Sequence, residues 1–132
     1  MTRLSQALEF RCKFRQPSLV PEASLTAQDI SRLSMQLGLI EEEGNEFKEA
    51  ILTWIEAPSK EAKAHALKEL ADLVYVCYQM AAFLNVDLDS ALDRVHESNM
   101  SKLGDDGNPI FNAFGKVMKG PNYKEPYLND LV

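Results

Sequence analysis

The chain has 132 residues, of which 20 are acidic and 14 basic, so its formal net charge is -6. This length suits one domain that buries a core of its own without disulfide or metal staples. The acidic balance excludes a broad basic surface for a nucleic acid polymer or an anionic membrane. A small anionic ligand is still compatible with it, if a metal ion mediates the contact.

The cysteine pattern and the hydropathy of the chain indicate its compartment. Cys12 and Cys77 show no Cys-x-x-Cys spacing and no disulfide framework. The first residues lack the apolar stretch of a signal peptide, and no stretch approaches the roughly 18 apolar residues of a membrane span. We therefore expect a soluble, cytoplasmic protein with reduced thiols.

Apolar residues recur at steps of three and four along the first half of the chain, which predicts two helices. The first covers residues 4–14 and stops at the stretch 16–21, because proline cannot continue a helix interior. The second begins after Thr26, a residue type favoured as an N-cap, and ends near Ala57 and Pro58. It is the longer of the two.

Two further helices follow by the same spacing. Ser59 caps a third helix that runs to Asn85. Either Asp87 or Asp89 starts a fourth, which continues toward Lys102 before a glycine-rich turn. The sequence predicts an all-α fold, an antiparallel four-helix bundle.

The end of the chain is irregular, because residues 103–132 hold four of the six glycines and three of the six prolines. Segments 109–111 and 116–118 can pair as a small hairpin across 112–115. We expect one domain over residues 1–132. It consists of an N-terminal helix and linker at 1–25, a helical core at 26–102 and a C-terminal arm at 103–132.

Two acidic motifs stand out on the second and third helices: Glu42-Glu43-x-x-Glu46 and Glu69-x-x-Asp72. The simplest interpretation is a pair of solvated faces, because most glutamates on amphipathic helices face water. Residues three and four apart lie on the same face of a helix, however, and at this spacing the carboxylates share their faces with apolar residues. These are Met35, Leu39, Val76, Met80 and Phe83. Neither acidic stripe therefore belongs to a wholly solvated face.

Counting from the turn near Ala57 places the two motifs at matching heights on antiparallel helices. Glu46 and Glu69 lie about eleven residues from that turn, or roughly 16 Å, and Glu43 and Asp72 about fourteen, or roughly 21 Å. The same count across the turn near Asn85 brings Asn99 and Lys102 to about the same level. Carboxylates, an amide and an ammonium are thus predicted to converge.

Several carboxylates gathered in partly dry space repel one another, and Lys102 alone cannot neutralise them. A hard divalent cation removes this cost. Mg²⁺ takes oxygen ligands and keeps positions open for water and phosphate, and Mn²⁺ can substitute for it. The absence of a cysteine or histidine cluster argues against structural zinc.

With these motifs in place, the chain resembles the MazG-like all-α nucleoside triphosphate pyrophosphohydrolases, which are related to dimeric dUTPases and to phosphoribosyl-ATP pyrophosphohydrolase. The likeness covers most of the chain. It is carried by the acidic motifs at 42–46 and 69–72, by a fourth-helix segment at 95–102, and by the glycine- and lysine-containing tail at 115–123.

The resemblance implies hydrolysis of a nucleoside triphosphate to the monophosphate and pyrophosphate with Mg²⁺. Glu43 is expected to be the general base and a further ligand, although Glu42 and Glu43 can exchange roles. The other expected metal ligands are Glu42, Glu46, Glu69 and Asp72. The expected substrate contacts are Asn99, Lys102, Lys116, Lys119 and Tyr123.

The resemblance also implies a substrate class and an assembly. Phosphoribosyl-ATP hydrolases are usually shorter, without this N-terminal lead or tail, so a deoxynucleotide or non-canonical nucleotide is favoured over phosphoribosyl-ATP. Relatives work as homodimers or homotetramers. Independently, the third helix is apolar nearly all round at 73–78, which predicts burial against more than one neighbour.

Two other classes are consistent with parts of the sequence. A non-enzymatic helical module could present its acidic patch to a basic partner. A di-iron oxidase needs Glu-x-x-His pairs on two helices, and here only Asp93-x-x-His96 comes close.

Overall fold

A computed structural model describes residues 1–20 and 24–132 of the chain. These residues form four α-helices and one short 3-10 helix, with no strand among them. They divide into two compact units, residues 1–86 and 87–132, and each is described by itself. The all-helical class and the four expected helices are confirmed, whereas the packing of all four into one bundle stays a prediction.

The first unit holds three helices, α1 (Arg3–Lys13), α2 (Ala27–Glu56) and α3 (Lys60–Leu84). The Thr26 side chain accepts a hydrogen bond from the Asp29 amide, and the Asp29 carboxylate accepts one from the Thr26 amide. This reciprocal capping box confirms the predicted start of α2. Pro21, the last residue of the proline-rich stretch, lies outside the described residues.

The predicted ends of α3 are also confirmed. The Ser59 hydroxyl accepts from the Ala62 amide at the start of the helix. Asn85 ends it with a left-handed backbone, φ 58°, which asparagine tolerates better than most residues. The Asn85 side chain donates to the Leu19 carbonyl and so ties the segment after α1 to the end of α3.

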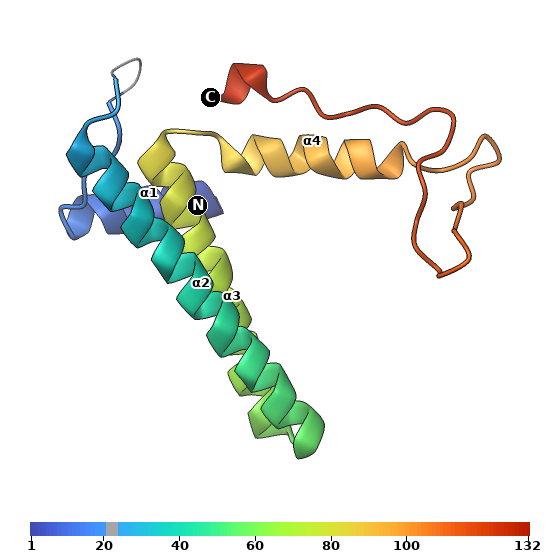
Figure 1. Cartoon of the computed structure of the whole chain (residues 1–132), viewed down its shortest axis with the longest axis horizontal. Helices are drawn as coiled ribbons and strands as arrows, with labels where there is room; N and C mark the ends of the chain where they lie inside the picture. The colour runs from blue at the N-terminus through green and yellow to red at the C-terminus, as the bar shows by residue number, and fades with distance from the viewer. Residues whose placement is uncertain (21–23) are drawn as a thin grey trace. The chain divides into compact units, whose positions relative to one another are not determined.

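The core of the first unit lies where α3 packs against both α2 and α1 (Figure 1). Its buried apolar residues are mostly small, which lets the helix axes approach closely. They are Ala7, Ala50, Ala66, Tyr78, Ala81, Ala82 and Phe83. The polar side chains of Arg11, Gln36, Glu69 and Gln79 are buried among them. Because burying an unpaired polar or charged group is costly, these four side chains need hydrogen-bond or ionic partners.

Several apolar side chains that the helical spacing assigned to the core are exposed in this chain. Leu67 on α3 is 66% exposed, and Leu70, Val74 and Tyr75 are each at least 40% exposed. They leave one side of α3 uncovered, so its expected burial against more than one neighbour is not seen within this unit. No helix in the described parts of the chain is both long and apolar enough to cross a membrane.

The second unit consists of α4 (Leu88–Met100) and the arm that returns along it. Asp87, rather than Asp89, caps α4, because its carboxylate accepts from the Ser90 amide at 3.0 Å. The arm is fastened by an ion pair between Arg94 and Asp130 and by the Ser98 hydroxyl, which donates to the Lys124 carbonyl. A 3-10 helix at Asn129–Leu131 was not predicted.

The expected hairpin exists in a reduced form. Phe111 and Val117 form one isolated antiparallel bridge, flanked by a 2.7 Å bond from the Met118 amide to the Ile110 carbonyl. The Asn112 side chain accepts from two amides of the turn, those of residues 114 and 116. Gly115 supplies the positive φ of 78° that closes the turn.

Gly120 joins the arm to the end of α4, and its replacement tests this part of the fold. An added Cβ would lie 2.6 Å from the carbonyl oxygens of Lys102 and Leu103. We expect Gly120→Ala to destabilise the second unit by about 1–3 kcal/mol, measured by amide hydrogen exchange of the arm. Gly38→Ala is the control, since a Cβ there meets nothing within 4 Å. Equal protection in both variants would contradict this account.

Candidate metal centre

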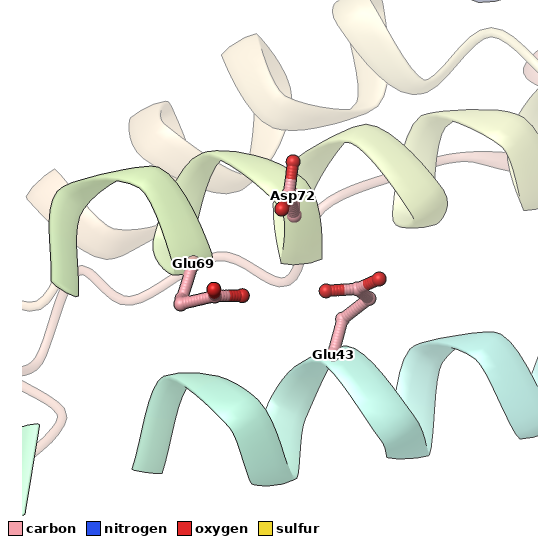
Figure 2. A group of neighbouring side chains, drawn as sticks. All are labelled: Glu43, Glu69 and Asp72. Carbon is pink, nitrogen blue, oxygen red and sulfur yellow. The ribbon is translucent and has the colours of Figure 1, made fainter. Parts of the chain in front are cut away.

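A group of three carboxylates lies between α2 and α3. Glu43 projects from α2 opposite Glu69 and Asp72 of α3 (Figure 2). One oxygen from each of the three lies within 4.8 Å of the others. Glu43 faces α3 because it stands seven residues from Gln36 and from Ala50, both of which are buried.

The group is partly dry, and two of its oxygens have no hydrogen-bond partner. Glu69 is only 5% exposed, and Oε2 of both Glu69 and Glu43 is buried without any donor among the described residues. An unpaired buried carboxylate costs several kcal/mol, because neither water nor a donor replaces its hydration. A cation, a proton or a bound water would satisfy such oxygens.

A fourth carboxylate faces the same group. The pKa of Glu46 is raised, first by a hydrogen bond to the Glu43 carboxyl and by the negative charge of Glu43. Burial and the charges of Glu69 and Glu42 raise the pKa further. A second negative charge beside Glu43 is therefore unfavourable, which favours the protonated form of Glu46 relative to an isolated glutamate.

Two basic side chains on α3 border the cluster, and neither was singled out from the sequence. Lys68 Nζ lies 2.7 Å from Asp72 and 3.5 Å from Glu69, and His65 Nε2 lies 3.7 Å from Glu69. The hydrogen bond and charge of Asp72 raise the pKa of Lys68. Both partners stand four residues before their carboxylate, a spacing that could have identified them. Lys68 is 64% exposed, so it offsets only the outer part of the negative charge.

The group fits a hard divalent cation. Oxygens bound to one Mg²⁺ or Ca²⁺ lie about 2.0–2.6 Å from the ion, so they cannot be more than about 5 Å apart. The three carboxylate oxygens satisfy that limit. The two unpartnered buried oxygens are the acceptors that such an ion would satisfy, and the donor set is entirely oxygen.

The remaining expected site residues lie elsewhere. Glu42 is exposed and outside the group of three. The expected substrate contacts belong to the second unit, where the structure describes them only relative to that unit. Asn99 is exposed on the last turn of α4, and Lys102 follows that helix half-buried. Lys116 and Lys119 are exposed on the arm, with Lys119 Nζ 4.6 Å above the Tyr123 ring.

A comparison with known families supports the geometry. Residues 8–99 match the family described as phosphoribosyl-ATP pyrophosphohydrolase, and the chain belongs to that family. No curated protein matches the chain. The matched segment contains all the acidic-motif residues and ends at Asn99, before Lys102 and the arm. The family identifies a hydrolase of nucleotide phosphoric anhydrides, in agreement with the resemblance to MazG-like enzymes.

The perturbed carboxyl of Glu46 predicts a pH dependence of stability. A pKa raised above the ordinary 4.5 means that this group stabilises the fold at acidic pH, and that the stabilisation is lost as pH rises through the raised pKa. In metal-free buffer we expect Glu46→Gln to melt at a higher temperature than the parent at neutral pH. The difference should disappear as pH falls toward about 4.5.

The control for this experiment is Glu49→Gln, which removes an exposed carboxylate from the same helix. It should leave the pH profile close to that of the parent. Identical profiles for Glu46→Gln and Glu49→Gln would contradict the crowding of carboxylates between α2 and α3.

Proposed function

We propose that this protein is a divalent-cation-dependent hydrolase that converts a nucleoside triphosphate to the monophosphate and pyrophosphate. The carrying observation is the pair of buried, unpartnered oxygens on Glu43 and Glu69, in a chain that belongs to a pyrophosphohydrolase family. A solvated acidic face would not leave carboxylate oxygens buried and unpaired. The acidic-patch interaction module is therefore the weaker candidate.

We assign Glu43, Glu69 and Asp72 as ligands of Mg²⁺, with Mn²⁺ as an alternative ion. Their mutual distances support this assignment. Glu46 is the fourth proposed ligand, since its carboxyl adjoins that of Glu43. Bound Mg²⁺ would neutralise phosphate oxygens and lower the pKa of a coordinated water. Glu43 is also the proposed general base, and the adjacent Glu42, which is exposed, can exchange roles with it.

The reaction needs one water molecule and no covalent enzyme intermediate. The water oxygen bonds to the α phosphorus. The anhydride P–O bond between the α and β phosphates breaks, and pyrophosphate leaves with the bonding electrons. The carboxylate base accepts the proton from the attacking water. Positioning and charge neutralisation supply most of the acceleration in phosphoryl transfer, and a carboxylate site with its cation provides both.

We propose a deoxynucleoside or non-canonical triphosphate as substrate. The support is the tail at 115–123, which resembles that of phage and bacterial MazG-like members and lies outside the matched segment. Phosphoribosyl-ATP, named in the description of the family, is the alternative substrate. The proposed substrate contacts are Asn99, Lys102, Lys116, Lys119 and Tyr123.

We also propose a homo-oligomer, a dimer or tetramer. Its support is the uncovered side of α3, formed by the exposed Leu67, Leu70, Val74 and Tyr75. These side chains and the nearby Ala7 line a groove of ≈ 440 Å³ between α1 and α3. Contiguous apolar surface of this kind marks an association site in a soluble protein.

The activity is tested by pyrophosphate release from a panel of canonical and modified triphosphates, including deoxynucleotides and phosphoribosyl-ATP. We expect turnover with Mg²⁺ or Mn²⁺ and none with chelator. Glu43→Gln and Glu69→Gln should reduce kcat by roughly a hundredfold or more, because each removes a ligand of the proposed cation.

Glu61→Gln is the matched control, since it changes an exposed carboxylate in the first turn of α3. It should retain the activity of the parent. Absence of metal-dependent turnover with every nucleotide would exclude the proposed hydrolysis. Turnover of phosphoribosyl-ATP alone would exclude the proposed substrate class.

The oligomer is tested by light scattering at micromolar concentration. We expect a mass of two or four chains for the parent and a smaller mass for Val74→Lys, because a charge at this position opposes burial of the α3 face. Leu92→Lys, at an exposed position of α4, should leave the mass unchanged. A monomeric parent would refute the proposal.

A further inference from the structure

A second charged site lies in the first unit, away from the carboxylates. A pocket of ≈ 170 Å³ opens where the end of α1 and the turn after it meet the early turns of α2 and the end of α3. Three arginines line it, and none of the described lining residues is acidic. The lining consists of Arg11, Phe14, Arg15, Gln16, Pro17, Arg32, Met35, Gln36 and Phe83. This is an unusual concentration of positive charge in a chain of net charge -6.

Arg11 is the buried member of the set. It is 4% exposed, donates to Gln79 Oε1 at 3.4 Å and to the Pro17 carbonyl, and lies over the Phe83 ring. Its Nε is buried without a hydrogen-bond partner, and burial lowers its pKa. A guanidinium keeps its charge in proteins, so the pocket contains a cation that carbonyl and amide oxygens only partly compensate.

Arg15 occupies a left-handed backbone position that glycine adopts with less strain. The amide of Gln16 donates to the Arg11 carbonyl at 2.8 Å and that of Arg15 to the Cys12 carbonyl at 3.3 Å, which closes α1 with a Schellman motif. Arg15 therefore has a left-handed backbone, φ 52°. A non-glycine residue here is unfavourable by itself, so the side chain has a reason of its own to be present.

No carboxylate in the described part of the chain neutralises these arginines. Within residues 1–20 and 24–132, none of the three arginines forms an ion pair. Arg32 slightly lowers the pKa of Asp29, but that carboxylate is held by the Thr26 amide in the capping box and does not line the pocket. The positive charge of the pocket is therefore available to a ligand.

The size of the pocket suits a small ion or the phosphate group of a larger ligand. Its ≈ 170 Å³ is below the roughly 300 Å³ at which pockets for drug-sized ligands begin. This volume admits a tetrahedral oxyanion of five heavy atoms, such as phosphate. Gln36 Oε1, buried and unpartnered, can accept from a protonated oxygen, or its amide can turn to donate.

The pocket is separate from the carboxylate group along the same helices. Gln36 stands seven residues before Glu43 on α2, or about 10 Å, and Phe83 stands eleven residues after Asp72 on α3, or about 16 Å. The two sites share no lining residue. An anion in the pocket is therefore not one that the proposed metal ion holds.

We propose that Arg11, Arg15 and Arg32 form a binding site for a phosphate-sized oxyanion, with Arg11 as its buried floor and the other two as its rim. Bidentate guanidinium contacts match phosphate oxygens in geometry and charge. Free phosphate or pyrophosphate can supply this chemistry, and so can a phosphate monoester remote from the reacting triphosphate. The site does not depend on the hydrolysis proposed above.

The test is a titration of the full chain with inorganic phosphate in metal-free buffer, followed by calorimetry. The parent should bind, and the double variant Arg15→Gly, Arg32→Gln should bind roughly tenfold more weakly or worse. Arg15→Gly suits the left-handed backbone and Arg32 is only half-buried, so this variant should fold. Arg3→Gln, at an exposed position of α1, is the control and should bind as the parent does.

Parallel titrations with pyrophosphate and ribose 5-phosphate identify the source of the anion. Tighter binding of ribose 5-phosphate assigns the site to a monoester, and tighter binding of phosphate or pyrophosphate assigns it to the free ions. The proposal is overturned if none of the three binds the parent, or if the double variant binds them as tightly as Arg3→Gln does.

Discussion

Repulsion among four carboxylates between α2 and α3 is the constraint on which the site depends. Glu43, Glu46, Glu69 and Asp72 are held together by helix packing, and the single lysine at their edge is mostly in water. The helices could relieve the repulsion by separating, but buried alanines on both sides keep them close. A divalent cation among these carboxylates would relieve the repulsion, and metal binding and stability would then be linked.

The same unit buries charge of the opposite sign at its other end. Among the described residues, Arg11 has no carboxylate partner and the carboxylates have too few cations, yet seven to eleven residues of helix separate the two groups. A chain selected only for stability would pair such charges or replace them with apolar side chains. Their separation is what a protein needs if one end binds cations and the other binds anions. Helix α3 contributes to both sites: Glu69 and Asp72 belong to the carboxylate group, and Phe83 lines the arginine pocket.

Local signals predicted the helices well because caps and breakers act within a few residues. Thr26 and Ser59 cap their helices where their side-chain chemistry indicated, and Asp87 is the one of two candidate aspartates that caps α4. Which glutamate faces α3 was harder, since Glu42 and Glu43 are adjacent, and the seven-residue spacing of Gln36, Glu43 and Ala50 was the informative signal. The burial of Arg11 could not be predicted, because it depends on how α1 and the following turn pack onto α3. The exposure of Leu67 and Val74 likewise reflects tertiary packing, which helical periodicity does not specify.

The central claim is that the carboxylate group between α2 and α3 binds a divalent cation, and Mn²⁺ titration followed by electron paramagnetic resonance tests it most directly. The full chain should deplete the signal of free Mn²⁺, and Mg²⁺ should compete for the same site. Glu69→Gln should lose this binding, because it removes the most buried carboxylate of the group. Glu49→Gln should retain it. Undiminished Mn²⁺ binding by Glu69→Gln, or no binding by the parent, would contradict the account.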